Sequence, residues 1–147
     1  EITVAEGRGL NPRWSPNGQW IAFGRVNEDG SIDLVVLDKD GNGESVAAAG
    51  VNGEVAHEWS PDSRQLVYVI GSGSDAEIYV IGRDGKDMKQ LTSNRVEDRQ
   101  PRWSSNGSSI LFLSAGDGAF DVYRMGKDGD QQSRLTLKSE LVLGADW

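Results

Sequence analysis

The chain has 147 residues, enough for one domain of ordinary size, and its apolar (37%) and charged (26%) fractions are those of a globular protein. Its formal net charge of −8 argues against nucleic acid as a partner, because phosphate binding depends on clusters of Lys and Arg. It has no cysteine, which excludes disulfides, thiolate catalysis and Cys-ligated zinc. No apolar run approaches the ~20 residues of a membrane helix, so we expect no membrane span.

Tandem repetition is the dominant feature of the sequence. Four of the five tryptophans, at positions 14, 59, 103 and 147, are separated by 45, 44 and 44 residues. Asp-Gly pairs begin at positions 40, 84 and 128, and Leu-Thr pairs at 91 and 135. Three independent markers at one spacing indicate repeats of about 44 residues. We place them at 8–50, 51–94 and 95–138, with a partial repeat at 139–147, in a single domain spanning 1–147.

Each repeat predicts four short strands in chain order. The first ends at the tryptophan, and a turn such as Ser-Pro-Asn-Gly follows it. The second is apolar on both faces and is expected at 20–23, 66–70 and 110–113. The third is expected at 34–37, 78–81 and 122–125, and the Asp-Gly pair forms a hairpin to the fourth, at 45–49, 89–92 and 134–137. A strand that is apolar on both faces needs cover on both sides, as radially packed sheets provide.

These patterns predict an all-β fold, a β-propeller of four-stranded antiparallel blades, with three blades in this chain. Propellers have four to eight blades, so we expect half or a fragment of a larger ring, with six blades in total. The missing blades would come from a longer parent chain, the reading we favour, or from a second copy in a homodimer. The chain starts at Glu1 without Met and shows no signal peptide, which suggests a processed or truncated product.

The sequence Trp-Ser-Pro-Asn-Gly-Gln-Trp-Ile-Ala-Phe at 14–23 resembles the TolB-type propeller repeat. Ile78-Tyr79-Val80, Arg83-Asp84-Gly85 and Leu91-Thr92 match the second half of that repeat. Departures lie at Ser63, where the turn glycine is expected, at Ser105, where proline is expected, and at Ala47-Ala48, where Leu-Thr is expected.

The resemblance implies a propeller that binds a protein partner, in a periplasmic or extracellular protein, although the cytoplasm is not excluded. The same repeat occurs in propellers of prolyl-oligopeptidase-type and tricorn-like peptidases and in carbohydrate-active proteins. These, and a calcium-binding propeller, are the alternatives. The chain itself lacks a nucleophile elbow and has a single histidine, so we expect no hydrolytic or redox activity from it.

Several residues near the tryptophans are candidates for a role at the central channel. Trp14, Trp59 and Trp103 are expected to be buried between blades. The residues just before each tryptophan point to the opposite side of the strand and alternate in sign: Arg13, Glu58, Arg102 and Asp146. We favour solvated edge residues for these four, and the alternative is a charged ring near the channel that a partner could contact. His57, the only histidine, is expected at the channel edge or in a structural role.

Two motifs resemble ligand sites. Asp38, Asp40 and Asn42 have the spacing of the first half of a calcium loop, but position twelve is Ala49 instead of a glutamate, so a plain hairpin is preferred and no cofactor is expected. The run Gly71–Ala76 matches a dinucleotide fingerprint formally, but a strand and not a helix is expected after it, which favours a loop.

Overall fold

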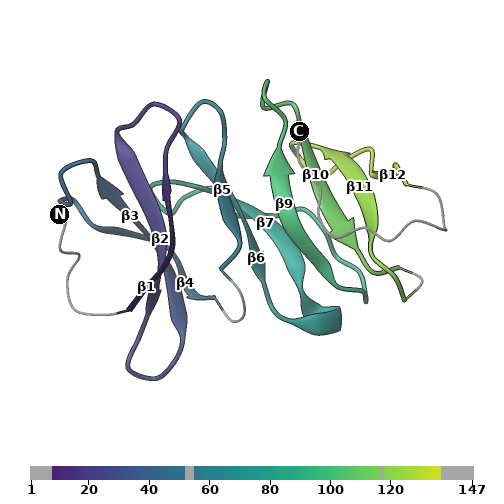
Figure 1. The fold of residues 1–147 in the computed structure, drawn as a ribbon, viewed down its shortest axis with the longest axis horizontal. Helices are drawn as coiled ribbons and strands as arrows, with labels where there is room; N and C mark the ends of the chain where they lie inside the picture. Colours follow the sequence, from purple (N-terminus) through teal and green to yellow (C-terminus); the bar gives the residue numbers. More distant parts are fainter. Residues whose placement is uncertain (1–7, 52–54, 117, 137–147) are drawn as a thin grey trace.

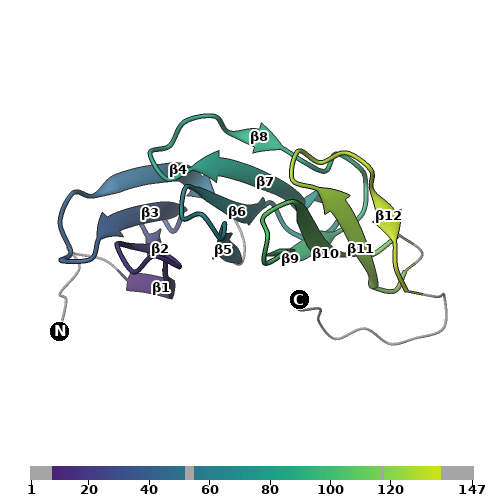
Figure 2. The same cartoon turned by 90° about the horizontal axis from the view of Figure 1, so that it is seen from above.

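The computed structural model describes residues 8–51, 55–116 and 118–136. These residues form three separate four-stranded antiparallel sheets, one for each repeat, with no α-helix among them and one 3₁₀ turn at Gly73–Asp75. The expectation of propeller blades is therefore confirmed. The sheets do not close into a ring (Figures 1 and 2).

The strands follow one another across each sheet in chain order. The first sheet contains β1 (Arg8–Trp14), β2 (Trp20–Val26), β3 (Ile32–Asp38) and β4 (Ser45–Val51). The second contains β5 (His57–Trp59), β6 (Gln65–Ile70), β7 (Glu77–Gly82) and β8 (Lys89–Gln90). The third contains β9 (Asp98–Trp103), β10 (Ser109–Ser114), β11 (Asp121–Gly126) and β12 (Ser133–Arg134). We call these sheets blades 1, 2 and 3.

The three blades stand side by side along an arc (Figure 2). The first strand of each blade, β1, β5 or β9, lies on the concave side of the arc, and the fourth, β4, β8 or β12, lies on the convex side. This arrangement places the concave strands where a closed propeller has its channel.

One turn recurs between the first two strands of every blade. In blade 2 the Ser60 hydroxyl donates to Asp62 Oδ1 (2.6 Å) and accepts from the Gln65 backbone N–H (3.0 Å). The Ser63 N–H donates to the Ser60 carbonyl (2.8 Å), and Ser63 has a left-handed φ of 61°, close to the 67° of Gly18 and the 69° of Gly107 in the other blades. Serine thus replaces glycine here without changing the turn.

The fourth strands of blades 2 and 3 are shorter than the sequence predicts. β8 ends at Gln90 and β12 at Arg134, because the threonine of the Leu-Thr pair that follows accepts a hydrogen bond with its side chain instead of its backbone carbonyl. The Thr92 Oγ1 accepts from the Ile78 backbone N–H (2.9 Å), and the Thr136 Oγ1 accepts from Val122 N–H (3.1 Å). A side-chain oxygen therefore replaces the ladder carbonyl and ends the strand.

Tryptophan side chains fill the junctions between blades. Trp59 is 4% exposed, packs with Ala22 and Leu34 of blade 1, and donates from Nε1 to the Arg13 carbonyl oxygen (3.1 Å). Trp103 is 6% exposed and packs in the same way against the apolar face of blade 2. Each tryptophan is thus covered by the blade that precedes it.

The expectation that Trp14 is buried was wrong, since its side chain is 56% exposed. Trp59 and Trp103 are each covered by the blade that precedes them, whereas β1 is the first strand among the described residues, so no described blade precedes Trp14. All seven residues of β1 are exposed, including Leu10. This face of blade 1 therefore has the tryptophan of a blade junction, as Trp59 and Trp103 do, but no described blade packs against it.

Candidate functional site

A hollow of about 230 Å³ lies on the concave side, where the first strands of the three blades meet. It is bordered by residues of all three blades, namely Asn11, Arg13, Val55, Ala56, His57, Gln100, Pro101 and Arg102. We call it the concave groove. Three candidates from the sequence, Arg13, His57 and Arg102, therefore come together there.

The sequence did not point to Asn11 and Gln100, which also border the concave groove. Both have a left-handed backbone, with φ of 49° and 51°, and both lie where the pairing of β1 or β9 shifts its register. Bulges of this kind turn side chains toward a surface and are common beside functional sites. Each precedes a proline at the same position in its repeat (Pro12 and Pro101), which is the signal that could have indicated them.

The charged residues that precede the tryptophans are partly brought together. Arg102 Nη1 lies 3.7 Å from Glu58 Oε1, and Glu58 Oε2 accepts from the Trp103 backbone N–H (2.7 Å). Arg13 is exposed and borders the same groove. Asp146, the fourth candidate, lies outside the described residues, so a complete ring remains a prediction.

His57 is buried at the border of the groove, with 5% of its surface exposed. Its Nδ1 lies 3.1 Å from the Val55 carbonyl and its Nε2 lies 3.3 Å from the Ala22 carbonyl. Burial lowers the pKa of His57 below its ordinary value, with the nearby Arg13 charge acting in the same direction, against the opposing effect of the two carbonyls. His57 thus lies between the carbonyls of Val55 and Ala22, in a setting that favours the uncharged imidazole.

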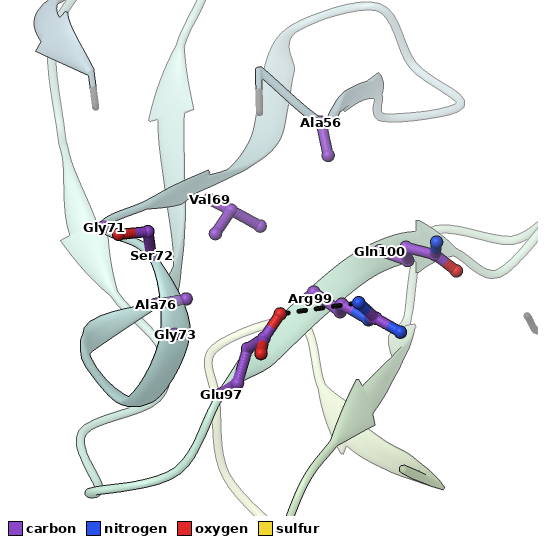
Figure 3. A pocket seen from close by; sticks show the side chains of 9 residues that line it. All are labelled: Ala56, Val69, Gly71, Ser72, Gly73, Ala76, Glu97, Arg99 and Gln100. Carbon is purple, nitrogen blue, oxygen red and sulfur yellow. Dashed lines mark hydrogen bonds and ion pairs between the residues drawn. The ribbon is translucent and has the colours of Figure 1, made fainter. Parts of the chain in front are cut away.

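Figure 3 shows a second hollow, of about 200 Å³. It adjoins the first, because Ala56 and Gln100 border both. The Gly71–Ala76 loop and Val69 lie on one side of it, and Glu97 and Arg99 lie on the other. Arg99 Nη1 is 3.5 Å from Glu97 Oε1, and the guanidinium lies over the Phe120 ring at 3.6 Å. The two hollows form one depression that runs from the concave strands toward the loops.

The loop reading of the glycine-rich run is confirmed. Gly73–Asp75 forms a 3₁₀ turn, and β7 follows it instead of a helix, so the geometry needed for a dinucleotide is absent from this part of the chain.

The calcium-like segment forms a tight hairpin. Asp38 Oδ1 accepts from the backbone N–H groups of Asp40 (2.9 Å) and Asn42 (2.8 Å), and Lys39 Nζ lies 2.6 Å from Asp40. Two of the candidate ligands are thus engaged within the turn. Among the residues that the structure describes, no group of three or more His, Asp or Glu side chains is arranged to hold a metal.

Comparison with known proteins identifies the repeat. The family model described as the TolB beta propeller domain matches residues 2–147. The chain belongs to the TolB β-propeller family. A curated relative, the Tol-Pal system protein TolB of Desulfosudis oleivorans, is 28% identical over 91 residues, which are 62% of this chain and 20% of that protein.

Solved TolB structures share the fold. The putative TolB of Agrobacterium tumefaciens superposes with a TM-score of 0.77 at 23% identity, over 94% of this chain and 51% of that one. TolB of Acinetobacter baumannii gives 0.77 at 20% identity, over 95% and 35%. A puromycin-hydrolysing peptidase of Mycobacterium tuberculosis gives 0.71 at 17% identity, over 90% and 24%. The chain therefore spans about half or less of the length of these TolB relatives.

Within the described residues, no helix is long and apolar enough to cross a membrane.

Proposed function

We propose that this TolB-type chain is a non-catalytic module that binds a protein partner in the concave groove, and that it works in the periplasm. The observation that supports this most directly is the meeting of Arg13, Gln100 and Arg102 around one hollow formed by three separate blades. Side chains carried on rigid strands give a binding surface with little ordering cost. The TolB relative's name places that protein in the Tol-Pal system, so Pal is the first partner to test.

The binding test uses charge reversal in the groove. Arg102→Glu and Arg13→Glu should weaken binding of Pal, measured by calorimetry, because a rim charge that attracts the partner would then repel it. Lys127→Glu is the matched control, since Lys127 borders a different hollow near the turns. Equal loss in all three variants, or no loss in the groove variants, would contradict the proposed site.

A second candidate function is the propeller of a peptidase. The likeness to the puromycin-hydrolysing peptidase, at a TM-score of 0.71, favours it as an alternative. An α/β-hydrolase segment in the same gene would select this alternative, since the catalytic groups of such an enzyme would lie there.

We also propose that further TolB-type blades cover the Trp14 face. We propose that these blades belong to the same polypeptide. The alternative is that a second copy of this chain supplies them. Light scattering of the purified chain distinguishes the two sources. A stable two-copy species with cooperative unfolding would overturn the single-polypeptide reading, whereas non-stoichiometric association that Trp14→Ser reduces would support it.

A further inference from the structure

Two carboxylates are buried where blade 2 meets the start of blade 3. Glu77 is 8% exposed and Asp98 is 0% exposed. Glu77 Oε2 and Asp98 Oδ1 are both buried and have no hydrogen-bond partner. Neither carboxylate forms an ion pair with a Lys, Arg or His among the described residues. Ionised carboxylates in such a setting need a compensating positive charge.

Asn94 ties the two acids to one small region. Its backbone N–H donates to Glu77 Oε1 (2.7 Å), and its Nδ2 donates to Asp98 Oδ2 (2.7 Å). The Asp98 N–H donates to the carbonyl of Ala76, the residue before Glu77 (2.9 Å). The same residue, Asn94, thus contacts one oxygen of each carboxylate. Asn94 itself is exposed, so solvent reaches the edge of the cluster.

The equivalent acids in the other blades have a built-in cation. Asp33 of blade 1 lies 3.1 Å from Arg25, which pairs with it across β2 and β3. Asp121 of blade 3 lies 2.7 Å from Arg134 on β12. The comparison shows that the repeat normally supplies a guanidinium beside this acid.

Blade 2 lacks both arginines. The residue across from Glu77 is Ile70, where blade 1 has Arg25. Gln90 pairs with Tyr79 just as Arg134 pairs with Tyr123, so Gln90 stands where blade 3 has its arginine. Glu77 is therefore the one acid of the three without a guanidinium partner, and Asn94 links it to Asp98.

We propose that Glu77 and Asp98 form a binding site for a hard cation, with Ca²⁺ as the test ion. Glu77 Oε2 and Asp98 Oδ1 are its side-chain ligands, and water completes the oxygen coordination that Ca²⁺ prefers. The cation takes the place of the guanidinium in blades 1 and 3. With two carboxylates, the site belongs to the weak class, with a dissociation constant of about 10⁻⁴–10⁻³ M.

The test measures the thermal midpoint of unfolding of the chelator-treated chain while CaCl₂ is raised from about 0.1 to 10 mM at constant ionic strength. Equilibrium dialysis measures the bound Ca²⁺ under the same conditions. The midpoint should rise with Ca²⁺, because a ligand of the folded state stabilises it by mass action. Glu77→Gln and Asp98→Asn should abolish the rise and the bound ion. Asp33→Asn, the matched control, should keep both.

Gln90→Arg gives a test that does not depend on removing an acid. It restores the arginine of blade 3, so it should raise the midpoint without Ca²⁺ and remove the response to Ca²⁺. No binding to the unaltered chain, or binding that survives in Glu77→Gln and Asp98→Asn, would overturn the site. A proton shared by the two acids would appear as a pH-dependent midpoint with no response to Ca²⁺, and would also overturn it.

Discussion

Among single residues, His57 has the environment most sensitive to pH. It is buried between two carbonyl oxygens, and its folded pKa lies below the ordinary value of 6.5. The unfolded chain therefore takes up a proton more readily than the folded one as pH falls. The stability that His57 contributes is fully present above pH 6.5 and is lost as pH falls toward the folded pKa.

We therefore expect the free energy of unfolding, measured in urea, to decrease from about pH 8 to about pH 5. His57→Gln should remove the part of this decrease that begins near pH 6.5. The carboxyls of Asp29, Asp33 and Asp62, whose pKa values are lowered, lose their contribution only below the ordinary value of 3.8, so they do not interfere. An unchanged pH profile in His57→Gln would assign the decrease to other groups.

Among the structural elements, the turn after each tryptophan recurs in all three blades. Gly18, Ser63 and Gly107 each donate a backbone hydrogen bond to the carbonyl of the serine three residues earlier, at 2.8–2.9 Å. Blades 1 and 2 have proline after that serine, at positions 16 and 61, whereas blade 3 has Ser105. The blade 3 turn thus lacks the proline that the other two turns have.

Ser105→Pro should stabilise the chain by about 0.4–1 kcal/mol, because proline restricts the unfolded state at a position where the turn already accepts it. Ser104→Ala, one residue earlier, should instead destabilise it by about 1–3 kcal/mol. The Ser104 hydroxyl is buried and accepts from the Ser109 N–H (3.0 Å). Urea denaturation of both variants checks the pair. Destabilisation by Ser105→Pro would show that the blade 3 turn differs from the other two.

Strand positions and turns could be predicted from the sequence because each depends on local chemistry that repeats every 44 residues. The bulges at Asn11 and Gln100 could not be, because a register shift depends on the neighbouring strand. The meeting of Arg13 and Arg102 at one hollow could be expected only as a consequence of strand alternation. The buried pair of Glu77 and Asp98 was missed, because burial of a charged residue follows from packing between blades.

For the molecule as a whole, stability depends on the junctions between blades. Trp59→Ala should cost about 3–5 kcal/mol, because a large buried side chain and its bond to the Arg13 carbonyl are both lost. Trp14→Ala is the matched variant at the same repeat position, and with a 56% exposed side chain it should cost far less. Thermal or urea unfolding measures both. Equal costs would mean that the Trp14 face is covered in solution.

The pairing of Glu58 with Arg102 also constrains how such a protein can evolve by duplication. A copy of blade 1 inserted between blades 2 and 3 would set its arginine, the duplicate of Arg13, beside Arg102, and an attraction would become a repulsion. It would also leave the Trp103 N–H without the Glu58 carboxylate that accepts from it. The blades are thus similar in shape but not interchangeable in sequence, because the Glu58–Arg102 pair favours blade 2 as the neighbour that precedes blade 3.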